Sequence, residues 1–93
     1  MSRLLDRVRQ AIREGRYAIS RHANEEMDED SLTVADVESV ILTGQIVRRL
    51  TDDPRGPRME IGGSALDGRV AHVVCRFIET ELLRIITAYV PEE

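Results

Sequence analysis

Apolar residues in the first half of the chain recur every three or four positions, the period of a helix that buries one face. We expect three helices there, over residues 2–14, 21–29 and 34–43. Ser20 and Thr33 stand where N-caps are favoured, and Asp36 is spaced to complete a short capping box with Thr33. Residues 17–19, between the first two helices, are expected to form a short extended link.

After Gly44 the apolar period shortens to two, and Val and Ile become frequent, which is typical of strands. We expect four strands, over residues 46–50, 59–64, 69–78 and 82–90. Two prolines and a glycine within residues 52–58 predict a loop. Asp67-Gly68 predicts a hairpin turn, and the pair Gly62-Gly63 indicates a bulge or a close backbone approach.

Helices followed by strands predict an α+β protein, with three N-terminal helices packed on one face of a four-stranded, mainly antiparallel sheet. A chain of 93 residues is expected to form a single domain, residues 1–93. The register of the last two strands depends on their loop. A three-residue loop would place Arg76 opposite Arg84, an unfavourable pair of like charges, so we expect a two-residue loop at Thr80-Glu81.

This register predicts which side chains share each face of the last two strands. The face against the helices would hold Ala71, Val73, Cys75, Phe77, Ile86 and Ala88. The opposite face would hold His72, Arg76, Leu83, Ile85, Thr87 and Tyr89. Polar side chains among aliphatic ones make the second face the expected place for a site, and Cys75 is expected to be a core residue.

Charge is distributed unevenly along the chain, although its total is only −4. Residues 1–22 carry net +4, residues 23–45 net −7, and residues 46–93 net −1. Every basic residue is Arg, which suits phosphate recognition because a guanidinium binds phosphate with two parallel hydrogen bonds; codon usage in a GC-rich genome is the alternative explanation. The overall acidity argues against strong nonspecific binding of nucleic acid, but leaves room for a local basic face.

The composition also restricts where the protein works. No apolar run approaches the ~20 residues that a membrane helix needs, and charges interrupt the first residues too often for a signal peptide. The single cysteine, Cys75, leaves no internal disulfide. We therefore expect a cytoplasmic protein with no membrane contact.

The two histidines are the candidate acid–base groups, because imidazole exchanges protons near neutral pH. His22 stands in the first turn of the second helix and His72 in the middle of a strand, so the pair could serve RNA cleavage at the 2′-hydroxyl. A structural role for each is the alternative. His22 and three nearby acids, Glu25, Glu26 and Glu29, have a spacing that a metal could use, but a solvated acidic face explains them better. Neither a metal nor another cofactor is expected.

Several short motifs occur together in order: Ser20-x-His22-Ala23, Asp53-Pro54-Arg55-Gly56-Pro57, His72-Val73-Val74 and Ile86-Thr87-x-Tyr89. Their order and spacing resemble a bacterial family of small domains of unknown function that is grouped with RelE-type and BrnT-type toxins. The resemblance implies a RelE-like fold and an RNA-cleaving or RNA-binding ancestry. It also implies roles for His22, His72, Thr87 and Tyr89, which match recurrent positions. Glu26 and the acidic residues 28–30 depart from the family, which usually has basic residues there.

Two functions remain open at this point. The first is a toxin-type, metal-independent ribonuclease or its inactive descendant, acting on RNA and paired with an antitoxin-like protein. In it, His22 and His72 would exchange protons and Tyr89 would donate a hydrogen bond. The phosphate binders would be Arg55, Arg58 and Arg76. The second is a non-catalytic module that binds a protein or a second copy of the chain through residues 21–30 and the Arg-rich first helix.

Overall fold

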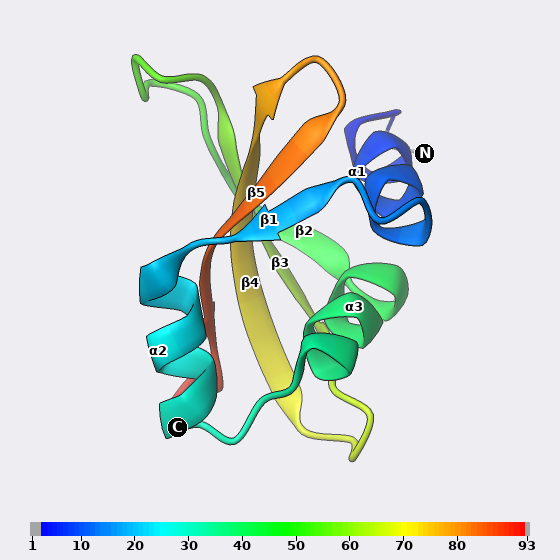
Figure 1. Ribbon diagram of the computed structural model, residues 1–93, viewed down its shortest axis with the longest axis vertical. Coiled ribbons are helices and arrows are strands. Elements are labelled where there is room, and N and C mark those ends of the chain that lie inside the picture. The colour runs from blue at the N-terminus through cyan, green and yellow to red at the C-terminus, as the bar shows by residue number, and fades with distance from the viewer. Residues whose placement is uncertain (1–2, 93) are drawn as a thin grey trace.

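The computed structural model describes residues 3–92. Its elements are α1 (Arg3–Arg13), β1 (Tyr17–Ile19), α2 (Arg21–Glu29), α3 (Val34–Thr43), β2 (Gln45–Leu50), β3 (Arg58–Ser64), β4 (Val70–Glu79) and β5 (Leu82–Tyr89) (Figure 1). The three expected helices and four expected strands are all present, and their described ends differ from the prediction by at most one residue. Residue 2, where the first helix was expected to begin, lies outside the described residues. The capping box between Thr33 and Asp36 is confirmed at the start of α3.

The sheet has five strands in the order β1-β5-β4-β3-β2, and it is mixed because β1 runs parallel to β5. The α+β class is confirmed, but the prediction of a four-stranded, mainly antiparallel sheet is wrong. The fifth strand is β1, where the sequence indicated only an extended link. Three residues are too few to show an apolar period of two, so the sequence pattern does not predict this strand. It forms because the edge of β5 pairs with it.

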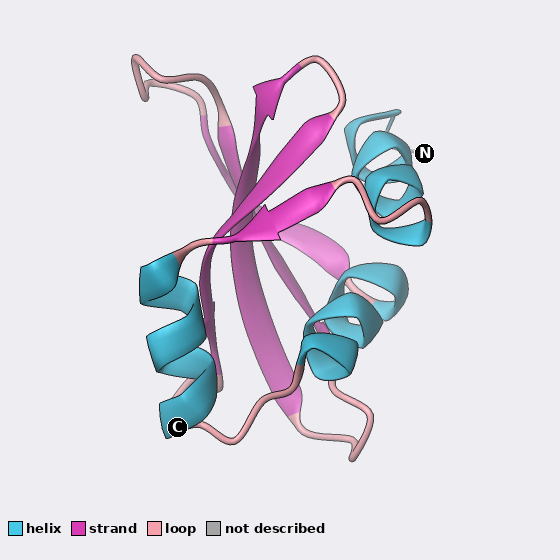
Figure 2. Cartoon of the chain, viewed as in Figure 1, coloured by secondary structure: helices cyan, strands magenta, loops and turns pink. Residues whose placement is uncertain are grey.

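One core joins the helices to one face of the sheet (Figure 2). The helices contribute buried residues that include Val8, Ile12, Met27, Val37 and Ile41. The strands contribute alternate residues that include Met59, Ile61, Val73, Cys75, Leu83 and Ile85. Because side chains of a strand alternate between faces, the residues between these point to the opposite face, which we call the open face. Cys75 is fully buried, as expected for a core residue.

The predicted register of the last two strands holds at both ends of the hairpin and fails between them. The two-residue loop at Thr80-Glu81 is present, and residues 72–74 pair with residues 87–89 as that loop predicts. Two irregularities, between Phe77 and Glu79 and between Val74 and Cys75, shift the pairs between them by one residue. Val74 pairs with Thr87 but the next residue, Cys75, pairs with Ile85, so Ile86 is an extra residue in β5. An extra residue in one strand reverses its alternation from that point onward. After the extra residue, Thr87 points to the open face, as expected. Before it, the side chains of β5 point to the faces opposite to those predicted.

The corrections therefore fall in the first half of β5. Leu83 and Ile85 are completely buried against the helices, not on the open face. Arg84 lies directly opposite Arg76, the pairing that like-charge repulsion seemed to exclude. Burying two large aliphatic side chains outweighs the repulsion between two partly solvated guanidinium groups.

Acidic side chains of α2 complete the edge of the sheet where β1 ends. The strand β1 pairs only with the first half of β5. Beyond it, Glu26 Oε1 accepts a hydrogen bond from the Ala88 N–H at 3.3 Å, and Asp30 Oδ2 accepts one from the Val90 N–H at 2.8 Å. Glu26, which was expected on a solvated face, and Asp30 thus satisfy backbone donors at a strand edge, which explains acidic residues at positions where the resemblance leads one to expect basic ones.

The glycine pair in β3 marks a close backbone approach, one of the two predicted explanations. A Cβ at Gly63 would lie 2.3 Å from the Val40 carbonyl oxygen and 2.8 Å from Gly44 Cα. A Cβ at Gly44 would lie 2.4 Å from the Gly62 carbonyl oxygen. The end of α3 therefore rests directly on the backbone of β3, and this contact sets how the helix layer sits on the sheet.

Candidate functional site

Three arginines form a row across the open face. Arg76 of β4 pairs with Arg84 of β5 on one side. On its other side, the pairing of Met59 with Cys75 places Arg58 of β3 next to Arg76. The row exists because three neighbouring strands each carry an arginine at the same level of the sheet.

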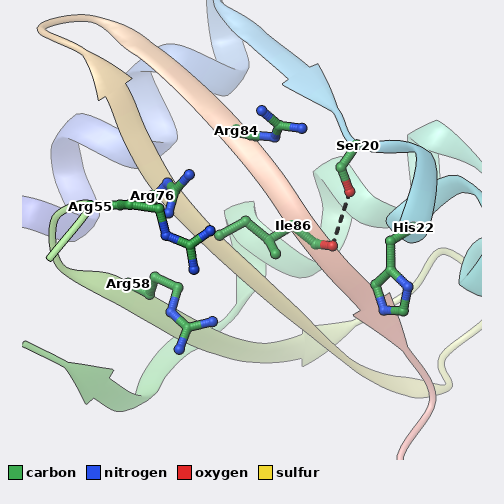
Figure 3. A pocket seen from close by; sticks show the side chains of 7 residues that line it. All are labelled: Ser20, His22, Arg55, Arg58, Arg76, Arg84 and Ile86. Atoms are coloured by element: carbon green, nitrogen blue, oxygen red, sulfur yellow. Dashed lines mark hydrogen bonds between the residues drawn. The ribbon is translucent and has the colours of Figure 1, made fainter. Parts of the chain in front are cut away.

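These arginines surround a pocket of about 300 Å³. Its lining residues are Ser20, His22, Arg55, Arg58, Arg76, Arg84 and Ile86, and we call it the arginine pocket. Figure 3 shows Arg55, Arg58 and Arg76 gathered at one end, with Ser20 and His22 at the other and Ile86 between them. The pocket thus combines a loop, three strands and the start of α2.

A buried carboxylate organises the arginine end of the pocket. The Asp53 side chain is only 6% exposed, and its Oδ2 lies 3.0 Å from Arg58 Nε and 4.0 Å from Arg76 Nη1. Its Oδ1 lies 3.3 Å from Arg55 Nε. The hydrogen bond from the Arg55 backbone N–H is the main cause that lowers the pKa of Asp53, with the arginine side chains acting in the same direction. The loop predicted at residues 52–58 is therefore held by ion pairs of its own residues.

Four guanidinium groups against this one carboxylate leave an excess of three positive charges, in a chain whose net charge is −4. Some of the donors are also unused. Within residues 3–92, the buried Nε atoms of Arg58 and Arg76 have no hydrogen-bond partner; Arg58 Nε is near Asp53 but is not aligned with it. A positive pocket with unsatisfied donors is suited to an anion with several oxygen atoms, such as phosphate.

A second polar cluster lies farther along the open face, around Glu60, which is 8% exposed. Glu60 Oε2 is 2.6 Å from His72 Nδ1 and accepts a hydrogen bond from the Tyr89 hydroxyl at 2.9 Å. Its Oε1 accepts one from Arg48 Nη2 at 3.0 Å. The His72 hydrogen bond is the main cause that lowers the pKa of Glu60. Burial, followed by the hydrogen bond to Glu60, raises the pKa of Tyr89.

The sequence-predicted site residues therefore separate into two groups. His22, Arg55, Arg58 and Arg76 line the arginine pocket. His72 and Tyr89 belong to the Glu60 cluster, and their rings are 5.7 Å apart. Thr87 stands opposite Val74, at the level between the two groups. The two histidines do not line one pocket.

His22 is the more accessible histidine. Its side chain is 66% exposed, and its Nε2 lies 3.2 Å from Glu26 Oε1. Within the part of the chain that the structure describes, no three His, Cys, Asp or Glu side chains are grouped to hold a metal ion, the acidic positions around His22 included.

Sequence reasoning missed three residues that line the arginine pocket, and it missed Glu60 and Arg48 of the second cluster. Ser20 was recognised only as an N-cap, and Arg84 was placed away from Arg76 by the like-charge rule. Ile86 was assigned to the buried face. Glu60 gave a usable signal, since it is a lone carboxylate within the apolar run Met59-Glu60-Ile61 of a predicted strand.

Comparison with known proteins adds the family. None of the curated proteins and none of the solved structures compared with the chain matches it. None of the described helices has the length and apolar character needed to cross a bilayer. One family model matches residues 19–90, which is most of the chain and includes both polar clusters. The expectation of a small family without an assigned function is thus confirmed, and the chain belongs to the family described as a domain of unknown function, DUF4258.

Proposed function

We propose that the protein binds RNA through the arginine pocket, as a metal-independent ribonuclease of the toxin type or as a descendant that retains only the binding. The observation that carries the proposal is the row of three arginines on neighbouring strands, with a fourth from the loop, around a single carboxylate. The resemblance to RelE-type and BrnT-type toxins agrees with it.

The lining of the pocket explains why a nucleotide phosphate suits it better than a simple anion. Guanidinium groups bind the phosphate oxygens as forks, and Ile86 offers an apolar surface between the arginines and His22 on which a sugar or base can rest. The His22 side chain at the other end of the pocket is 66% exposed, so bound RNA can reach it.

Cleavage of RNA without a metal needs a group that takes the 2′-hydroxyl proton. The 2′-oxygen then forms a bond to the adjacent phosphorus as the bond from phosphorus to the 5′-oxygen breaks. The 5′-oxygen takes a proton from an acid or from water, which leaves a 2′,3′-cyclic phosphate and a 5′-hydroxyl. Positive charge near the phosphate stabilises the transition state, and the arginines of the pocket contribute it.

The binding step is tested with a fluorescein-labelled, single-stranded RNA and anisotropy titrations between about 50 and 200 mM salt. Arg84→Gln should weaken binding about tenfold or more at low salt, since it removes one charged phosphate contact. It should also reduce the slope of log affinity against log salt by about 0.7. Arg13→Gln, which removes the same charge from an exposed position of α1, is the matched control. Equal loss in both variants would refute specific binding at the pocket.

The cleavage step is tested with the same RNA in the presence of EDTA, with products separated by gel electrophoresis. We expect 2′,3′-cyclic phosphate ends from the wild type and much slower cleavage by His22→Gln with unchanged RNA affinity. RNA binding by the wild type without any cleavage would identify the binding-only descendant.

One observation favours a second candidate function, binding of another protein chain. The strand β2 is an outer strand of the sheet, and its bulge residue Val47 is 54% exposed. An outer strand offers backbone groups to a strand from another molecule, either a second copy or the antitoxin-like protein that the resemblance implies. A monomeric mass in sedimentation equilibrium at about 100 μM would argue against self-association through β2.

A further inference from the structure

The Glu60 cluster lies on the same face as the arginine pocket, at a distance that one strand of RNA can span. His72 and Arg76 both belong to β4 and are four residues apart, which corresponds to about 13 Å along the strand. Between them lie Val74 and its partner Thr87, which carry no charge. RNA with one phosphate in the arginine pocket can therefore extend along β4 until a neighbouring nucleotide reaches His72.

Glu60 holds the His72 ring in one orientation. The distance of 2.6 Å from Glu60 Oε2 to His72 Nδ1 is that of a strong, charge-assisted hydrogen bond. Tyr89 of β5 and Arg48 of β2 donate to the same carboxylate, so its oxygens act as acceptors. An ionised carboxylate accepts only, so in a neutral imidazole the proton must lie on Nδ1, and Nε2 is left as a bare acceptor.

A glycine makes room for the other edge of the ring. Gly62 of β3 pairs with His72, and a Cβ at Gly62 would lie 3.1 Å from His72 Nε2. The imidazole therefore lies over the backbone of β3, where any larger residue would push it away. The His72 side chain is 23% exposed, so the ring is held firmly but is not closed off from solvent.

We propose that Glu60 is a positioning residue that keeps the proton of His72 on Nδ1, so that Nε2 takes the 2′-hydroxyl proton of an RNA nucleotide next to the one held in the arginine pocket. The proposal rests on RNA binding at that pocket. The proton moves from the 2′-oxygen to Nε2, and the 2′-oxygen bonds to the phosphorus of the 3′-phosphate of that same nucleotide. The bond from this phosphorus to the 5′-oxygen breaks, and the 5′-oxygen takes a proton from water. The arginine pocket holds the neighbouring phosphate and so anchors the RNA strand. Glu60 itself remains a carboxylate and stabilises the imidazolium that forms.

The position of the proton is measurable without RNA. Nitrogen chemical shifts of uniformly ¹⁵N-labelled wild-type protein at about pH 8 separate a protonated from a bare ring nitrogen. We expect Nδ1 protonated and Nε2 bare in His72, and a mixture of the two neutral forms in Glu60→Gln. A proton on Nε2 alone, or on both nitrogens, in the wild type would overturn the proposal. This measurement needs no variant, so a poorly folded variant cannot confuse it.

The consequence for cleavage is measured with the labelled RNA. Glu60→Gln should lower the cleavage rate at least about tenfold, and His72→Gln by about 10²–10⁴-fold, with the RNA affinity of both within about twofold of the wild type. Glu79→Gln, at the exposed end of β4, removes the same charge and should change neither. Unchanged cleavage by folded Glu60→Gln, or no cleavage by the wild type, would overturn the role of Glu60. RNA binding that is equally tight in the wild type and in Arg84→Gln would instead refute the arginine pocket as the RNA-binding site.

Discussion

Gly63→Ala is the sharpest test of how the helices sit on the sheet. The added methyl group would point at the end of α3, 2.3 Å from the Val40 carbonyl oxygen and 3.0 Å from the Gly44 nitrogen. Both are backbone atoms, so no side chain can rotate away to make room. Relief requires α3 to move from β3.

The expected magnitude follows from two opposing effects. Overpacking of a tight contact costs about 1–3 kcal/mol or more, and a backbone contact lies at the upper end of that range. Alanine also has fewer conformations than glycine in the unfolded chain, which stabilises the folded state by about 0.4–1 kcal/mol. This gain applies at Gly63 because its φ is one that alanine can also adopt. A net loss of about 2 kcal/mol would lower the melting temperature of a domain of this size by about 8–16 °C.

The assay is thermal unfolding followed by circular dichroism, with urea unfolding to confirm the free energy. Ser64→Ala, an alanine at the next, exposed position of the same strand, is the control and should stay within about 0.5 kcal/mol of the wild type. A melting temperature for Gly63→Ala within about 2 °C of the wild type would refute the backbone contact between α3 and β3.

Three further predictions test single groups. Burial raises the pKa of Cys75 to about 12, so a thiol reagent should label it slowly in the native protein and quickly in denaturant; fast native labelling would remove it from the core. Hydrogen bonds from the backbone N–H groups of Thr33 and Leu66 lower the pKa of Asp36 in the folded state. The ionised carboxylate therefore stabilises the folded protein above the pKa that Asp36 has when unfolded, and this stabilisation is lost as the pH falls through its folded pKa. The stability difference between the wild type and Asp36→Asn should therefore shrink as urea unfolding is repeated from about pH 5 down to about pH 3, and a constant difference would contradict this. Asp53→Asn removes the carboxylate that holds three arginines of the pocket together, so labelled RNA should bind more weakly in the anisotropy titration, although the pocket gains one net positive charge; tighter binding would show that the carboxylate is not needed to arrange the arginines.

Residue types in the sequence predicted several residues of the candidate site, but not which of them lie together in space. His22, Arg55, Arg58 and Arg76 were chosen because imidazole and guanidinium suit RNA chemistry, and all four line one pocket. The carboxylates that organise the two clusters were not found, because Asp and Glu are common on surfaces and their partners are distant in the sequence. The like-charge rule failed at Arg84 because it considers one pair, whereas the pocket sets a nearby Asp53 carboxylate against the whole group of arginines.

The sequence by itself determined the elements whose causes are local. N-caps, helix periodicity and turn residues act within a few positions, so α2, α3 and the four long strands could be placed almost to the residue. Only the tertiary structure decided that β1 joins the sheet, that Ile86 forms a bulge, and that His22 and His72 belong to different clusters. The strand β1 and the two clusters depend on contacts between segments far apart in the chain, and no window of sequence contains both partners of such a contact. The bulge lies within one hairpin, but it depends on the helices, against which Leu83 and Ile85 are buried.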